Sequence, residues 1–162
     1  MKLERKHRDG FLFRLSAREK DLLFETIKLY PLVPAQHHRL TKTAAHQSDE
    51  NQRLLEEALA EQRAENRRQI EAMLQTPERL KQSGKSFLLQ LPMAEVNGLL
   101  QILNDVRVGS WLELGEPDED KPPQITADNF RYALALEVCG VFQSFLLAAL
   151  GETESPDWLA ES

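Results

Sequence analysis

Two short apolar runs, residues 11–15 (FLFRL) and 87–91 (FLLQL), are rich in residue types that favour β-strands. Ser16 and Glu19 follow the first run with the spacing of a capping box, which predicts that a helix begins there. Pro92 follows the second run and suits the first turn of another helix. A lone strand leaves its backbone groups unsatisfied, so the two runs are predicted to pair in a two-stranded sheet.

Residues 49–74 are rich in Glu, Arg, Gln and Ala, and no Gly or Pro interrupts them. This composition predicts a long helix. Its narrow apolar stripe favours a surface helix packed along one edge of the domain, and the alternative is a coiled-coil or partner-binding helix. Residues 93–114 carry a wider apolar face, which predicts contact with two neighbouring elements.

The C-terminal segment, residues 130–150, is apolar on nearly every side of a helical projection. Its few polar residues point in different directions, so they form no continuous polar face toward solvent. We therefore predict a buried central helix, covered all round by its own domain or by a second copy of the chain. Its most apolar run, residues 138–150, is too short to cross a bilayer, which argues against a membrane role.

These elements predict a mostly helical α+β fold. We expect one α-rich domain over residues 1–150, a four-helix orthogonal or bundle arrangement around the buried C-terminal helix, with the small two-stranded sheet at one side. The 162-residue length suits a single domain. Residues 151–162 are acidic and predict a flexible tail, in which Trp158 and Leu159 form a candidate docking motif for a protein partner.

The net charge of −6 disfavours general affinity for nucleic acid. The basic N-terminus, residues 2–8, is expected to be a solvated end, and weak nucleic-acid binding through it is the alternative. A single cysteine, Cys139, excludes an intramolecular disulfide framework. The N-terminus lacks the apolar run of a signal peptide, and a cytoplasmic location is expected.

Candidate chemistry centres on Glu137, because an unpaired carboxylate inside an apolar helix costs several kcal/mol. Arg107 and Arg131 are the cations available to pair with it. With Asn104 and Asp105 these residues predict a polar network, interpreted as a structural buried salt bridge. The alternative is a small enzyme with a buried Glu/Arg site. No second carboxylate accompanies Glu137 at a telling spacing, so no catalytic residue is predicted.

Neither a metal nor a cofactor is predicted. His37, His38 and His46 match no spacing typical of a metal site. No glycine-rich loop follows a strand, so nothing indicates a phosphate-binding loop.

Leu103-Asn104-Asp105-Val106-Arg107, with Gly109 and Leu112 behind it, follows the segment FLLQLPMAEV and precedes an acidic loop and a long apolar helix. In this arrangement the chain resembles an uncharacterised bacterial family, a domain of unknown function often encoded beside the ClpS protease adaptor in actinobacteria. The resemblance implies no activity, cofactor or catalytic residue, and only a link to protein quality control. Because no catalytic constellation is found and the C-terminal helix is apolar all round, the expected function is that of a non-enzymatic interaction or regulatory protein, with a homodimer among its expected assemblies.

Overall fold

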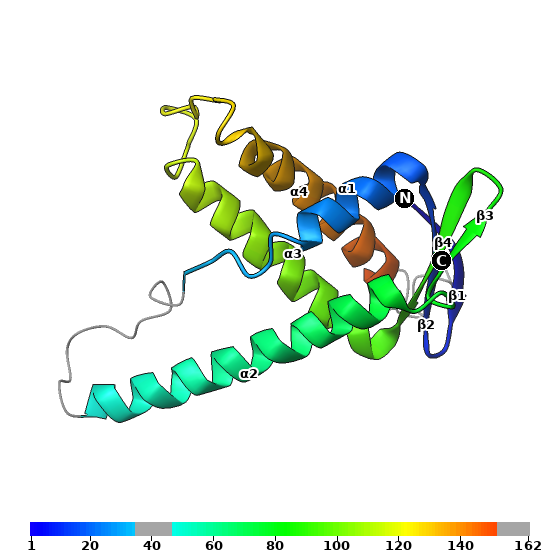
Figure 1. The fold of residues 1–162 in the computed structure, drawn as a ribbon, viewed down its shortest axis with the longest axis horizontal. Coiled ribbons are helices and arrows are strands. Elements are labelled where there is room, and N and C mark those ends of the chain that lie inside the picture. The colour runs from blue at the N-terminus through cyan, green and yellow to red at the C-terminus, as the bar shows by residue number, and fades with distance from the viewer. Residues whose placement is uncertain (35–46, 152–162) are drawn as a thin grey trace, which may run out of the picture.

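Four antiparallel strands form one sheet in the order β1-β2-β4-β3, and helices pack against it (Figure 1). The computed structural model describes residues 1–34 and 47–151. The described strands are β1 (Lys2–His7), β2 (Gly10–Ser16), β3 (Leu80–Ser83) and β4 (Ser86–Pro92). The described helices are α1 (Ala17–Ile27), α2 (Gln47–Gln75), α3 (Met93–Glu113) and α4 (Phe130–Gly151). The predicted mostly helical α+β class is confirmed.

The predicted pairing of the two apolar runs is confirmed, because β2 and β4 are the central neighbours, with Phe11 opposite Leu91 and Leu15 opposite Phe87. The prediction of a two-stranded sheet is wrong, since β1 and β3 flank this pair. Both edge strands are mostly polar, and in β1 only Leu3 is even partly buried, so neither shows a hydrophobic alternation. Charged side chains on an edge strand discourage pairing with other chains. The basic N-terminus is therefore an ordered strand, and its charged side chains are exposed to solvent as expected.

The chain forms the sheet from two similar units, β1–β2–α1 and β3–β4–α3. Each unit has an edge strand, a central strand and a helix that follows the central strand. The capping box at the start of α1 is confirmed, because Ser16 Oγ accepts the Glu19 amide at 3.1 Å and Glu19 Oε1 accepts the Ser16 amide at 2.9 Å. Glu19 also pairs with the N-terminal ammonium group of Met1. Pro92 is the N-cap of α3 and makes no side-chain cap.

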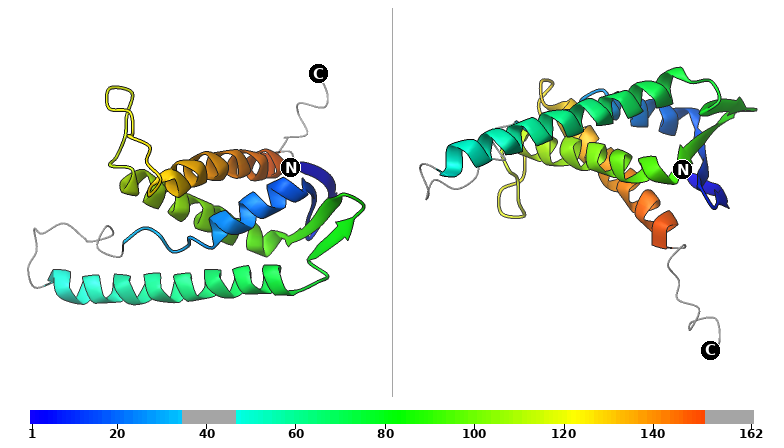
Figure 2. Two further views of the ribbon diagram at one scale, coloured as in Figure 1. Left: turned by 45° about the horizontal axis from the view of Figure 1, so that its top comes forward. Right: turned by 90° about the horizontal axis from the view of Figure 1, so that it is seen from below.

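Helix α3 is the centre of the fold, since it contacts the other three helices and both central strands. Figure 2 shows α2 along one side of α3, with α4 on the other. Only the second half of α2 enters the core, where Asn66, Ile70 and Met73 are its buried residues. Its first half is a surface helix, as predicted. The core combines the inner faces of the sheet and of α1, α3 and α4, and its largest fully buried side chains include Phe11, Phe13, Leu23, Leu91, Ile102 and Leu103.

Helix α4 gives only one face to this core, through Ala135, Val138, Cys139, Phe142, Leu146 and Ala149. The prediction that the C-terminal helix is the buried centre of the domain is wrong, because α3 takes that place. Of the two predicted ways to cover α4, its own domain covers only one face, and the second copy stays a prediction. On its other side Val141 is 52% exposed and Leu147 57% exposed. No other described element packs over that side. At 22 residues α4 has the length and apolar composition to cross a membrane, a criterion that the core helix of a soluble protein also meets.

Candidate functional site

The exposed side of α4 is the most distinctive surface of the described chain. Eight large apolar side chains are exposed in the described residues, and five of them lie on α4: Phe130, Leu134, Val141, Phe145 and Leu147. We define the α4 face as the exposed residues that follow one another at intervals of four and three: Phe130, Leu134, Glu137, Val141, Ser144 and Ala148. This spacing places all six along one stripe of the helix, as in the seam of a coiled coil.

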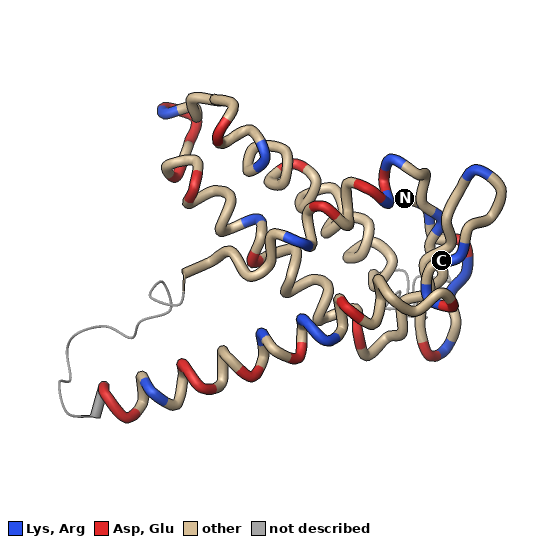
Figure 3. The backbone as a smooth tube through the Cα atoms, viewed as in Figure 1, with Lys and Arg blue, Asp and Glu red and all other residues tan. Residues whose placement is uncertain are grey.

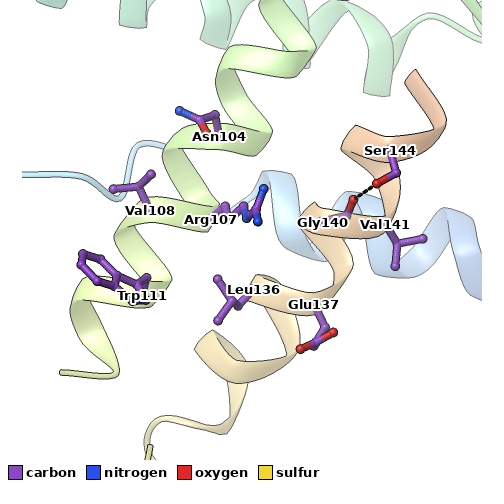
Figure 4. A pocket seen from close by; sticks show the side chains of 9 residues that line it. All are labelled: Asn104, Arg107, Val108, Trp111, Leu136, Glu137, Gly140, Val141 and Ser144. Atoms are coloured by element: carbon purple, nitrogen blue, oxygen red, sulfur yellow. Dashed lines mark hydrogen bonds between the residues drawn. The ribbon is translucent and has the colours of Figure 1, made fainter. Parts of the chain in front are cut away.

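An open groove of about 760 Å³ runs beside the α4 face, between α3 and α4 (Figure 4). The Arg107 guanidinium of α3 points toward α4 and donates to Gln143 Oε1 at 3.1 Å. Trp111 forms one end of the groove, and its indole Nε1 donates to the Pro117 carbonyl at 3.0 Å. The loop after α3 thus fixes the ring of Trp111, which is 37% exposed. The groove therefore combines a cation, an aromatic ring and the apolar flank of α4.

Glu137 is exposed, and the predicted buried salt bridge with Arg107 or Arg131 is wrong. Figure 4 shows the carboxylate on the same side as Val141, pointing away from Arg107. No hydrogen bond or ion pair joins the Glu137 side chain to another residue within 1–34 and 47–151. The reason is helical geometry: position 137 lies opposite the face of α4 that enters the core. The alternative of a small enzyme with a buried Glu/Arg site also required Glu137 to be buried, and this carboxylate is exposed.

The other members of the predicted polar network also separate. Arg131 donates to the hydroxyl of its neighbour Tyr132 at 2.7 Å, and its guanidinium lies 4.7 Å from the centre of that ring. Asn104 is exposed between two surface hollows, and its side chain makes no hydrogen bond to a described residue. Asp105 points to a different side of α3, toward the segment that leaves α1. The five residues therefore form no single network.

Asp105 is the centre of a polar junction that the sequence did not reveal. Its Oδ1 accepts the backbone N–H of Leu32 at 2.6 Å and that of Val33 at 3.2 Å. Arg63 of α2 lies 3.8 Å from Asp105 Oδ2 and donates to the Val33 carbonyl at 2.6 Å. Nearby, buried Asn66 donates to the Tyr30 hydroxyl at 3.2 Å. A sequence signal existed, because Pro31 and Pro34 keep the amides between them out of a helix, and such donors need acceptors.

Burial raises the pKa of the Cys139 thiol to about 12, and the nearby charge of Arg107 offsets only part of that effect. Cys139 is fully buried on the core side of α4. The thiol is therefore protonated and inert at neutral pH, because the thiolate is the reactive form.

The described segments near the two ends of α4 differ in charge (Figure 3). The loop between α3 and α4, residues 114–129, carries five carboxylates and one lysine. At the other end, β1 and its turn carry four cations, Lys2, Arg5, Lys6 and Arg8, and two carboxylates, Glu4 and Asp9. A hollow there joins Lys2 and Leu3 of β1 to Phe145 and Ala148 of α4. Among the described residues, the loop before α4 therefore has a net charge of −4, and residues 2–9 have a small excess of positive charge.

In the described residues, no group of three or more His, Cys, Asp or Glu side chains could hold a metal ion. His37, His38 and His46 lie outside that part of the chain, as do the candidate docking residues Trp158 and Leu159. The tail prediction for residues 151–162 is also beyond it, except at Gly151, which belongs to α4.

No protein-family model matches this chain, and neither a curated protein nor a solved structure is significantly similar to it. The resemblance to the family encoded beside ClpS stays a prediction.

Proposed function

We propose that this protein is a non-enzymatic interaction protein that binds a protein partner through the α4 face and the adjoining groove. The observation that carries the proposal is that five of the eight exposed large apolar side chains of the described residues lie on α4, and three of them, Phe130, Leu134 and Val141, lie on the α4 face. Apolar patches of this kind on soluble proteins mark interaction sites. Amphipathic helices use residues at such intervals to bind grooves or other helices.

The polar groups around the stripe support a protein partner better than a lipid surface. Glu137 lies in the middle of the stripe, and Arg107 lies beside it in the groove. Insertion into a bilayer would require burial of both charges in hydrocarbon, at several kcal/mol. A protein partner can instead provide a hydrogen bond or an opposite charge to each of these two side chains.

Site-specific photo-cross-linking in cells that express the chain tests this proposal. A photoreactive side chain at Val141 is expected to cross-link one defined protein, because that position is at the centre of the α4 face. The same group at Ala60, on the exposed first half of α2, is the control and is expected to give no such product. Binding of the purified partner should then be lost in Val141→Glu. Equal products from both positions, or none from either, would refute the proposal.

The enzyme alternative makes a different prediction. If the purified protein turned over a metabolite, and Glu137→Gln abolished the turnover, the non-enzymatic assignment would be wrong. A role in protein quality control rests on the family resemblance alone. Identification of the cross-linked partner as a protease component or its adaptor would support that role.

A further inference from the structure

We infer that the partner of the α4 face is a second copy of this chain, packed antiparallel about a two-fold axis that passes near Val141. This inference rests on the proposed function and names its partner. Three features of the described surface lead to it: the order of large and small side chains on the α4 face, the position of Glu137 and Arg107, and the different charges of the described segments at the two ends of α4.

The α4 face itself is bulky in its first half and small in its second half, while Phe145 and Leu147, also exposed in the second half of the helix, lie beside it. Phe130, Leu134, Glu137 and Val141 precede Ser144 and Ala148, and Gly151 continues the same spacing. In an antiparallel pair centred near Val141, Phe130 meets Gly151 of the partner subunit and Leu134 meets Ala148 of the partner subunit. Large side chains then fill the space above small ones, which allows two helices to approach closely. A parallel pair would set Phe130 against Phe130 and leave the small half poorly filled.

The same arrangement provides a partner for Glu137. With the axis near Val141, its carboxylate lies opposite Ser144 of the partner subunit. Arg107 is next to that position, because its guanidinium bonds the neighbouring Gln143. Arg107 and Ser144 line one groove with Glu137, on the same flank of α4. Antiparallel two-fold symmetry keeps this flank on the same side in both copies. Each Glu137 can therefore reach the partner's Arg107, and the dimer contains this charge pair twice.

The ends of the molecule favour the same direction. Antiparallel packing brings the acidic loop of one copy and the basic β1 of the other to the same end of the pair. Parallel packing brings like charges together at both ends. Such long-range electrostatic interactions influence the rate of association and the orientation of the two copies more than the affinity.

A charge exchange tests the contact. The wild-type chain is expected to show a mass of twice 18.6 kDa by light scattering. Glu137→Arg should raise the dimer Kd by about tenfold, since two charge pairs are lost and like charges face each other. Arg107→Glu should do the same, and the double exchange should return the Kd to within about threefold of wild type. Glu61→Arg, on the exposed half of α2, is the matched control and should leave the Kd unchanged.

Disulfide cross-linking tests the direction of the pair. A mixture of Leu134→Cys and Ala148→Cys chains should form a mixed disulfide dimer, because these positions meet across the axis. Neither variant should link to itself, since two copies of position 134 would lie ~21 Å apart in an antiparallel pair, far beyond disulfide reach. Cys139 is buried and does not compete. The substituted positions 61, 107, 134, 137 and 148 are all exposed, so circular dichroism should show native folding in each variant.

Four results would overturn the inference in distinguishable ways. A dimer in which each cysteine variant links to itself would show parallel packing. A monomer whose position 141 cross-links a different protein would refute the second copy and leave the proposed function standing. A monomer that sediments with phosphatidylcholine vesicles would show that lipid covers α4, and both proposals would be lost. A monomer with neither behaviour would also refute both.

Discussion

The carboxylate of Asp105 accepts the backbone N–H of Leu32 at 2.6 Å, so one side chain in the middle of α3 fixes the segment that leaves α1. The same carboxylate accepts the Val33 amide, while Arg63 of α2 bonds the Val33 carbonyl. Three parts of the chain that are far apart in sequence are joined at this one point. The stability of this junction can be measured separately from the α4 face.

Asp105→Ala should lower the free energy of unfolding by about 2 kcal/mol, because two partly buried amides lose a charged acceptor. Urea denaturation monitored by circular dichroism measures the loss. Asn104→Ala, at the exposed neighbouring position, is the control and should change stability by less than about 0.5 kcal/mol. Equal losses in the two variants would contradict the role of Asp105.

Two helical glycines should respond to alanine in opposite directions. A Cβ at Gly109 would lie 2.6 Å from Leu32 Cγ, so Gly109→Ala must displace Leu32 and should destabilise the fold by about 1–3 kcal/mol. A Cβ at Gly140 of α4 meets nothing within 4 Å, and Gly140→Ala should gain about 0.5–1 kcal/mol from helix propensity. Thermal unfolding at low protein concentration measures both, and a gain at Gly109 would refute the close approach.

Cys139 should resist thiol reagents in the native state. Its side chain is fully buried and its pKa is raised to about 12, so almost no thiolate forms at pH 8. Reaction with an aromatic disulfide reagent should therefore proceed at the rate of unfolding. Val141→Cys, on the exposed side of the same helix, is the positive control and should add one rapidly reacting thiol. Rapid reaction of the wild-type chain would contradict the burial.

The raised pKa of Cys139 also makes stability dependent on pH. The unfolded thiol loses its proton above about pH 9, whereas the native thiol keeps its proton up to about pH 12. The native state thus binds more protons in this interval, and the free energy of unfolding falls as pH rises through it. Cys139→Ala should remove the contribution of this thiol to the loss of stability between about pH 9 and pH 12. Denaturation curves at a series of pH values test the difference, and identical slopes for both proteins would refute it.

Arg79, the residue before β3, forms a paired contact with Glu95 in the first turn of α3, and both side chains are partly buried. Arg79→Lys should lower the free energy of unfolding by about 1 kcal/mol, because lysine cannot bond both carboxylate oxygens as a fork. Arg68→Lys is the matched control, since its partner Glu65 is exposed on the same helix, and no measurable change is expected. Similar effects at both positions would show that the fork geometry is unimportant.

The sequence predicted elements whose signals are local. The Ser16–Glu19 capping box, the polar helix later found as α2 and the paired strands β2 and β4 all rest on neighbouring residues or on a simple apolar run. Strands β1 and β3 escaped prediction because an edge strand buries little. Their β conformation comes from hydrogen bonds to β2 and β4, which a linear pattern does not display.

The candidate site shows the same division. Composition identified α4 as an apolar helix and singled out Glu137 and Arg107, yet it placed both in a buried network. Which side of an all-round apolar helix meets the core depends on where α1, α3 and the sheet lie. The sequence by itself determined that α4 is a helix whose apolar surface needs covering. Only the tertiary structure decided that the fold covers one face, leaves Val141 and Glu137 exposed, and assigns Asp105 to a separate junction, because packing partners are set by contacts between distant segments.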